Sequence, residues 1–237
     1  RVITFGQNPQ SDVLLKNVRV KNGHNVFDVT IRHRIQGGET QIDGLELPMP
    51  GIYNALNATA AIAVANRLGV SPEDIRKGLM NFSGVKRRFT TTGIVDGVRI
   101  IDDYAHHPVE ISSVLTAARS AAKGDVIAVM QPHRYSRLDD LFEEFAGCFN
   151  DANTVLIAPV FAAGEEPREG VSNASLVERM RAKGHRDARI LEGPEHLAKV
   201  LSERVKPDDY VVCLGAGNIT QWAAALPDEL KTYIGEK

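Results

Sequence analysis

The pattern of apolar and polar positions divides the chain into two parts. In the first 50 residues apolar side chains alternate with polar ones, as in antiparallel strands that bury one face. The alternating apolar positions are Val18, Val20, Phe27, Val29, Ile31, Ile42, Leu45 and Leu47. Asn22-Gly23 and Gly37-Gly38 lie between these runs, and both pairs suit tight turns. We therefore expect a β-hairpin followed by a further strand.

Two helices are expected after these strands. The first runs from about Asn54 to Leu68, is rich in alanine and has asparagine at its start. Ser71-Pro72 then supplies an N-cap and a proline at the first helical position of the second helix, which extends to about Asn81. Residues 1 to 6 also read as a strand that starts without any lead-in, so we expect the chain to begin inside a larger protein.

From Thr91 onward, apolar runs of strand length alternate with segments of helical length. The expected strands are Val98 to Ile101, Val126 to Met130, Thr154 to Ala158, Ala188 to Leu191 and Tyr210 to Leu214. The expected helices are Val109 to Ala122, Leu138 to Phe149, Ser172 to Lys183, Pro194 to Val205 and Ile219 to Ala225. This spacing is typical of βαβ units and predicts a doubly wound α/β domain. A basic, glycine-led segment at residues 84 to 89 is the expected joint between the two parts.

Composition excludes several classes of function. With 237 residues, of which 43% are hydrophobic, the chain can bury a substantial core, and its net charge of −2 gives no overall positive field for nucleic acid. Cys148 and Cys213 have neither metal-ligand nor disulfide-framework spacing, which suggests buried thiols in a reducing compartment. No apolar run approaches the ~20 residues that cross a bilayer, and the N-terminus lacks a signal pattern. We expect a cytoplasmic protein that binds neither nucleic acid nor membrane.

Candidate chemistry is concentrated in two short runs, residues 102 to 110 and residues 131 to 137. The first reads Asp-Asp-Tyr-Ala-His-His-Pro-Val-Glu and the second Gln-Pro-His-Arg-Tyr-Ser-Arg. Each follows an apolar stretch that reads as a buried strand, so both are expected where a parallel α/β sheet presents its loops to a ligand. Imidazole and basic side chains beside two carboxylates at one sheet edge predict a site for an anionic substrate.

Each of these motifs has an alternative interpretation. His106-His107 suggests a metal site, but neighbouring side chains on extended backbone point to opposite sides, so ligand contact is favoured over metal binding and over a loop histidine bonded to backbone. Arg134 and Arg137 are three residues apart at a helix entry, so both guanidinium groups are expected to face one side and clamp a carboxylate or phosphate. A solvated charged face is the alternative for this pair.

Two further segments are less specific. Lys86-Arg87-Arg88 is usual for a solvated linker, although its place at a domain joint also allows one arginine to reach a phosphate. Gly215-Ala216-Gly217 follows a strand and opens a helix, as in a dinucleotide loop, but the third glycine is missing. A tight turn whose amides face the cleft is therefore a better interpretation than a nicotinamide site, and an oxidoreductase is disfavoured.

Taken together, the motifs resemble those of the Mur ligase family. The resemblance rests on residues 51 to 58, residues 82 to 89, the two runs above, Ala162-Ala163-Gly164-Glu165 and Gly215-Ala216-Gly217. It implies that residues 90 to 237 form a Rossmann-like C-terminal domain. It also implies that residues 1 to 89 are the remaining β-hairpin and helical part of a central ATP-binding domain.

The resemblance implies an ATP-dependent ligase of peptidoglycan precursor synthesis. Its substrates would be UDP-N-acetylmuramate, whose carboxylate becomes an acyl phosphate, and L-alanine, whose amine displaces phosphate. By similarity Asn54 and Asn57 would lie near adenine, Arg88 near the ATP phosphates and Asp103 near the ribose. The muramoyl substrate and alanine would be held by Tyr104, His106, His133, Arg134 and Arg137, with help from Glu165. Within this set, Arg88, His106, His133, Arg134 and Arg137 are the expected catalytic residues.

The sequence departs from the family pattern in two places. Tyr53 stands where the family has histidine, and no Gly-x-x-x-x-Gly-Lys-Thr phosphate loop occurs in the 237 residues. Ligands for Mg²⁺ are expected upstream, so we expect no metal site here and no catalysis by this chain alone. The alternatives are a ligase that attaches a recycled tripeptide to the same carboxylate, or a stand-alone module that binds a nucleotide or carboxylate.

Overall fold

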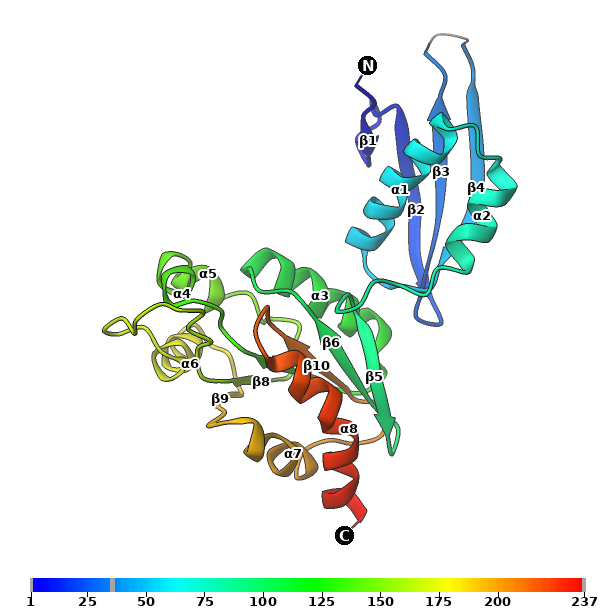
Figure 1. Ribbon diagram of the computed structural model, residues 1–237. Helices are drawn as coiled ribbons and strands as arrows, with labels where there is room; N and C mark the ends of the chain where they lie inside the picture. The colour runs from blue at the N-terminus through cyan, green and yellow to red at the C-terminus, as the bar shows by residue number, and fades with distance from the viewer. Residues whose placement is uncertain (1, 35–36, 236–237) are drawn as a thin grey trace. The chain divides into compact units, whose positions relative to one another are not determined.

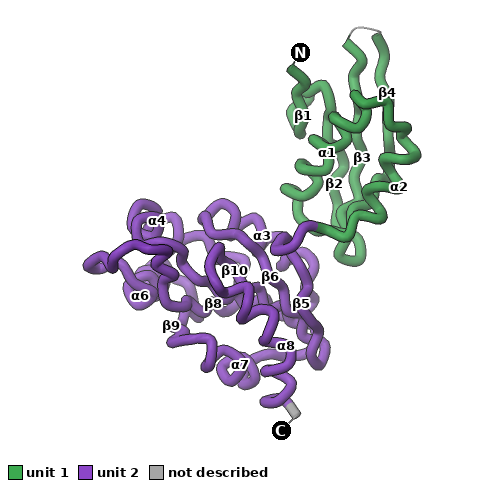
Figure 2. The backbone as a smooth tube through the Cα atoms, in the orientation of Figure 1, with its two compact units in different colours: residues 1–84 green, residues 85–237 purple. Residues whose placement is uncertain are grey.

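The computed structural model describes residues 2–34 and 37–235. The chain forms two compact units, residues 1–84 and residues 85–237, which are distinguished by colour in Figure 2. The boundary predicted from the sequence lay at residue 89. In the structure the segment 85–89 belongs to the second unit, because the Phe89 N–H donates to Asp103 and the Tyr104 N–H donates to Arg87 O.

The unit of residues 1–84 is a four-stranded sheet with two helices. Its strands, in spatial order, are β1 (Phe5–Gly6), β2 (Val13–Lys21), β3 (His24–Arg32) and β4 (Glu39–Leu47). The β2–β3 and β3–β4 pairs are antiparallel, and Asn22 and Gly23 have φ of 52° and 79°, which confirms the predicted hairpin. The helices are α1 (Ile52–Arg67) and α2 (Pro72–Met80). Phe27, Leu45 and Ile62 are fully or almost fully buried in its core.

The strand predicted for residues 1 to 6 is shorter in the structure. Arg1 lies outside the described residues, and only Phe5–Gly6 has strand geometry. The Thr4 N–H and hydroxyl both bond to the Asp12 carboxylate, so a side chain replaces the strand partner that the backbone of Thr4 would otherwise need.

The unit of residues 85–237 is built on a six-stranded sheet (Figure 1). Its strands, in spatial order, are β5 (Thr90–Val95), β6 (Val98–Asp103), β10 (Tyr210–Leu214), β7 (Val126–Met130), β8 (Thr154–Ile157) and β9 (Ala188–Ile190). All neighbouring strands are parallel except β5, which is antiparallel to β6. The predicted parallel α/β sheet is therefore confirmed.

Helices cover both faces of this sheet. They are α3 (Pro108–Ala121), α4 (Tyr135–Asp140), α5 (Phe142–Phe145), α6 (Asn173–Ala182), α7 (Pro194–Ser202) and α8 (Ile219–Gly235). Leu197 and Leu201 of α7 and Ala223 of α8 pack against Ile100 and Val129 on one face. Figure 1 shows α8 crossing the front of the sheet and α3 behind it, as in a doubly wound fold.

Three elements differ from the sequence prediction. Strand β5 was not predicted, although Asp96-Gly97, with φ of 47° and 80°, is the turn that joins it to β6. The helix predicted over residues 138 to 149 is instead two short helices, α4 and α5, and α4 begins earlier, at Tyr135. Helix α8 continues past Pro227, because Leu226 and Leu230 are both fully buried.

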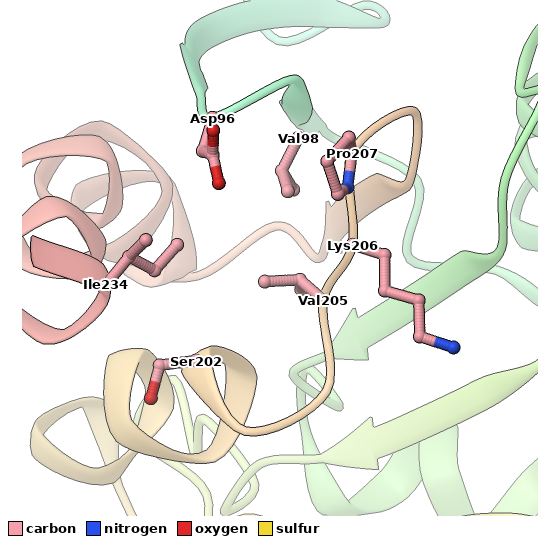
Figure 3. Close-up of a pocket in the computed structure, with 7 residues that line it drawn as sticks. All are labelled: Asp96, Val98, Ser202, Val205, Lys206, Pro207 and Ile234. Atoms are coloured by element: carbon pink, nitrogen blue, oxygen red, sulfur yellow. The ribbon is translucent and has the colours of Figure 1, made fainter. Parts of the chain in front are cut away.

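A cavity of about 340 Å³ lies at the end of the sheet where β6 and β10 begin. Val98, Pro207 and Ile234 line it, and in Figure 3 the Lys206 side chain points away from it. The charged motifs predicted from the sequence follow the opposite, carboxyl ends of the strands, so this cavity is not part of the candidate site. No helix in the described residues is both long and apolar enough to span a bilayer.

Candidate functional site

Three strands end at the same level and bring the predicted site residues together. Leu214 at the end of β10 pairs with Asp103 at the end of β6 and with Met130 at the end of β7. The loops that follow these three strands are residues 104–107, 131–134 and 215–218. They leave the same edge of the parallel sheet, which is where ligands bind in open α/β folds.

Four aromatic rings connect two of these loops and a third segment. The Tyr104 and His106 rings lie 5.1 Å apart, the His106 and His133 rings 6.3 Å apart, and the His133 ring stacks on Phe161 at 5.4 Å. Phe161 was not predicted to belong to the site. Its backbone, however, forms a parallel bridge with His133 and accepts the N–H of Arg134. The stacked rings therefore fix the position of His133.

His106 and His107 have separate partners. The Nδ1 of His106 lies 2.9 Å from the Tyr104 carbonyl oxygen, and the side chain of His107 caps the N-terminus of α3. Glu110 completes the cap, since its carboxylate accepts the backbone N–H groups of both histidines. Within residues 2–34 and 37–235 no group of three or more His, Cys, Asp or Glu side chains is placed to hold a metal ion.

Arg137 determines which nitrogen of His133 carries the proton. The Arg137 Nη1 lies 3.3 Å from His133 Nδ1 and 3.1 Å from the His133 carbonyl oxygen. A guanidinium only donates, so Nδ1 must accept, and a neutral ring carries its proton on Nε2. Burial lowers the pKa of His133, and Arg137, His106 and Arg134 lower it further. We therefore interpret His133 as a neutral ring with an Nε2–H donor.

This interpretation predicts the titration of His133. We expect its ring to ionise at a pH below the ordinary value of 6.5, and Arg137→Gln to move that pKa upward, because the variant removes a nearby positive charge. Two-dimensional ¹⁵N NMR of the imidazole reports both the pKa and the protonated nitrogen, with His196, a half-exposed histidine, as the internal control. A neutral Nδ1–H ring in the wild type would contradict the assignment.

The two arginines of the predicted clamp have different roles in the structure. Arg134 is exposed, and its guanidinium forms no hydrogen bond or ion pair within the described residues, so it is available to an anion. Arg137 instead folds back on His133. Nη1 of Arg137 is thus used within the protein, and the clamp formed by both arginines stays a prediction. Arg134 is the anion-binding candidate, and Arg137 positions the imidazole.

Glu165 is bonded within the protein as well. Its two carboxylate oxygens accept the Ser136 hydroxyl at 2.6 Å and the Ser136 N–H at 2.9 Å. These bonds lower the pKa of Glu165 and attach the loop that contains it to the first turn of α4. In this structure Glu165 positions the segment that follows Arg134, and its predicted contact with substrate stays a prediction.

Asp103 lies inside the protein, and its expected contact with a ribose stays a prediction. The residue is fully buried, and its oxygens accept the N–H groups of Ala105 and Phe89, both at 2.8 Å. Burial raises the pKa of Asp103 despite these two donors. In this structure the Asp103 carboxylate holds the backbone of residues 89 and 105 in place.

The remaining predicted residues are found on α1 and near the start of the second unit. Arg88 is exposed, and Tyr104 is 39% exposed. Asn54 is buried on α1 and donates its amide to Pro50 O at 2.7 Å, whereas Asn57 is exposed on the same helix. Of the two asparagines, therefore, only Asn57 presents its amide to solvent. Tyr53 is half-buried.

The loop after β10 is packed tightly against Gln131. The Gln131 amide donates to Asn218 Oδ1 and accepts the Ile219 N–H, so it joins the end of β7 to the start of α8. Gly215 has φ of 151°, and a Cβ there would lie only 2.8 Å from the Gln131 carbonyl oxygen. The sequence places Gln131 in the motif of residues 131 to 137. That Gln131 joins β7 to α8 depends on strand order, which the sequence pattern does not give.

Gly215→Ala is expected to destabilise the second unit by about 2 kcal/mol, because the new methyl group meets backbone that cannot move freely. The single tryptophan, Trp222, packs against the core of this unit, so its fluorescence during urea unfolding measures the change. Gly170→Ala is the matched control, since Gly170 also has positive φ but has no atom within 4 Å of the point that a methyl group would occupy. Equal losses in the two variants would show that the close contact is unimportant.

Comparison with known proteins places the chain in a family. Residues 87–217 match the family described as "Mur ligase, glutamate ligase domain". The chain is 60% identical over 236 residues to UDP-N-acetylmuramate–L-alanine ligase of Rhizobium etli, and 62% identical over 230 residues to that of Mesorhizobium japonicum. These alignments cover 100% and 97% of the chain. The chain spans about half the length of these relatives, 50% and 49% respectively.

Solved structures show the same fold. The UDP-N-acetylmuramate–alanine ligase of Thermotoga maritima superposes with a TM-score of 0.76 at 24% identity, over 99% of this chain and 48% of that one. A murein peptide ligase of Psychrobacter arcticus superposes with a TM-score of 0.61 at 21% identity, over 96% of this chain and 46% of that one. The matched residues, 87–217, contain the strand ends and loops described above, and they make up more than half of the chain. The chain therefore belongs to the Mur ligase family.

Proposed function

We propose that the full-length product of this gene is an ATP-dependent ligase that joins L-alanine to the carboxylate of UDP-N-acetylmuramate. The observation that carries the proposal is the free guanidinium of Arg134 beside His133, at the sheet edge where three loops meet. The high identity to ligases named for these two substrates, over 97% or more of this chain, supports the same substrates here.

The proposed reaction has two steps. A carboxylate oxygen of the muramoyl group attacks the γ-phosphorus of ATP, so that an acyl phosphate forms and ADP leaves. The neutral amine of alanine then attacks the acyl carbon, and inorganic phosphate leaves as the amide bond forms. Both steps concentrate negative charge on oxygen atoms, so fixed positive charges and hydrogen-bond donors that face those atoms lower the barrier.

The side chains at the sheet edge suit these requirements. Arg134 offers two parallel N–H donors to a carboxylate or an acyl phosphate, and the Nε2–H of neutral His133 adds a third donor. Tyr104 and His106 line the same edge. Exposed Arg88 is the proposed contact to the ATP phosphates, and Asn57 the proposed contact to adenine.

ATP and the UDP-linked precursor are substrates in this proposal, and both are available in the cytoplasm, where we place the reaction. Mg²⁺ accompanies ATP in phosphoryl transfer, where it neutralises charge on the phosphate oxygens. The described residues do not include a cluster that fits this ion, so we assign no step to it in this chain.

The experiment measures phosphate release from ATP by the full-length gene product with UDP-N-acetylmuramate and either L-alanine or a free tripeptide that begins with L-alanine. We expect turnover that depends on L-alanine. Turnover with the tripeptide alone would instead identify a recycling ligase, a function that the fold match to a murein peptide ligase also allows. No turnover with either amine would leave a nucleotide- or carboxylate-binding module.

A further inference from the structure

Three consecutive basic residues near the start of the second unit are not equivalent. Lys86 and Arg88 are exposed, but the side chain of Arg87 is only 23% exposed. The charge pattern alone does not distinguish the three residues, and only the family resemblance singles out Arg88 as a phosphate contact. In the structure the middle residue of the run is turned inward.

The Arg87 guanidinium contacts three different parts of the site. Its Nη2 donates to the Gly215 carbonyl oxygen at 2.5 Å, and its Nε lies 3.6 Å from the Asp102 carboxylate. The same guanidinium lies over the Tyr104 ring, 4.7 Å from the centroid. Asp102 is 4% exposed and also accepts the Thr220 hydroxyl at 2.7 Å. One side chain therefore connects the ends of β6 and β10 with the loop after β6.

The backbone on both sides of Arg88 is fixed to the same loop. The Arg87 carbonyl accepts the Tyr104 N–H at 2.9 Å, and the Phe89 N–H donates to Asp103 at 2.8 Å. Arg87 and Phe89 have φ of 60° and 52°, a conformation that non-glycine residues adopt only where surrounding contacts impose it. Arg88 lies between these two residues, and its own side chain is exposed and unbonded within the described residues.

We infer that Arg87 is a positioning residue, which holds the turn of residues 87–89 on the loop of residues 102–105 and so fixes the direction in which Arg88 presents its guanidinium. The inference rests on the proposed function in one respect, namely that Arg88 contacts a phosphate. Because the contribution of a catalytic charge depends strongly on its position, loss of the Arg87 contacts lowers turnover without removing any group that touches substrate.

The kinetic test uses the Arg87→Lys variant of the full-length protein. Lysine keeps the charge beside buried Asp102 but lacks the planar guanidinium and its several N–H donors. We expect kcat/KM for ATP to fall about ten-fold. Lys86→Ala, in the same turn but exposed, is the matched control and should change kcat/KM by less than about two-fold. In an Arg88→Ala background the Arg87→Lys change should also cost less than about two-fold, because the residue through which Arg87 acts is already absent.

A second measurement does not depend on activity. Hydrogen exchange at the Tyr104 and Phe89 amides of this chain should accelerate about ten-fold in Arg87→Lys, and should be unchanged in Lys86→Ala. Unchanged exchange, or an equal kinetic loss with and without Arg88, would overturn the inference. If the wild-type protein shows no ligase turnover, the proposed function fails, and the exchange result alone decides whether Arg87 fixes the turn.

Discussion

Arg134→Ala is expected to lower kcat/KM for alanine-dependent phosphate release roughly a hundred-fold, or about 3 kcal/mol. The guanidinium of Arg134 makes no bond inside the described structure, so its removal does not disturb a network that the fold needs. What is lost is a bidentate, charge-assisted contact to a substrate carboxylate or acyl phosphate. Coupled-enzyme detection of phosphate, with each substrate varied in turn, measures the loss and assigns it to one ligand.

Two variants serve as controls for this effect. Arg134→Lys keeps the positive charge but loses the planar pair of N–H donors. Its kcat/KM should lie between those of wild type and Arg134→Ala. Arg186→Ala removes an exposed arginine just before β9, at the opposite end of the sheet, and should leave kcat/KM unchanged. A loss of the same size in Arg186→Ala would mean that net charge matters and not the position of Arg134.

The backbone of Arg134 makes a related prediction about stability. Arg134 is the N-cap of α4 with φ of 73° and ψ of 135°, whereas the N-cap of α1, with φ of 97° and ψ of 135°, is glycine. A side chain in this region costs about 1 to 3 kcal/mol. Arg134→Gly should therefore lose activity as Arg134→Ala does, yet unfold at a higher urea concentration. A lower urea midpoint for Arg134→Gly than for wild type would show that the backbone conformation of Arg134 is not strained.

The sequence was sufficient to locate the site but not to assign each side chain. Apolar runs followed by Asp102-Asp103 and by Gln131 identified two strand ends, because buried parallel strands and their loops leave a strong local pattern. Which residue meets which depends on strand order, and β10 lies between β6 and β7 although it is last in the chain. The contacts of Arg87 with Gly215 and of Gln131 with Asn218 depend on that order.

Charged residues were the least predictable part of the site. The sequence motifs do not distinguish Arg137, Glu165 and Asp103 from residues that bind a ligand. In the structure each of these side chains is hydrogen-bonded within the protein. Burial and bonding of a polar side chain are set by tertiary contacts that a local pattern does not contain.

Helix α8 shows the same limit for secondary structure. The cost of Pro227 inside the helix is offset by burial of Leu226 and Leu230.

Asp103→Ala is expected to destabilise the second unit by about 3 kcal/mol. The substitution leaves the N–H groups of Phe89 and Ala105 without acceptors at a position that is fully buried, and each such loss costs roughly 1 to 3 kcal/mol. Urea unfolding followed by Trp222 fluorescence measures the change in this unit. Asp140→Ala, at an exposed position of α4, should change stability by less than about 0.5 kcal/mol.

The pH dependence of Asp103→Asn then separates hydrogen bonding from charge. Because burial raises the pKa of Asp103 above 3.8, the folded state binds its proton more tightly than the unfolded state does. The contribution of Asp103 to stability is therefore greatest below pH 3.8 and falls as the pH rises through the elevated pKa. Asparagine does not titrate, so the stability of wild type relative to Asp103→Asn should decline across that window. A difference that grew with pH would mean that the two N–H donors outweigh burial, and that Asp103 is an ordinary ionised carboxylate whose charge the loop requires.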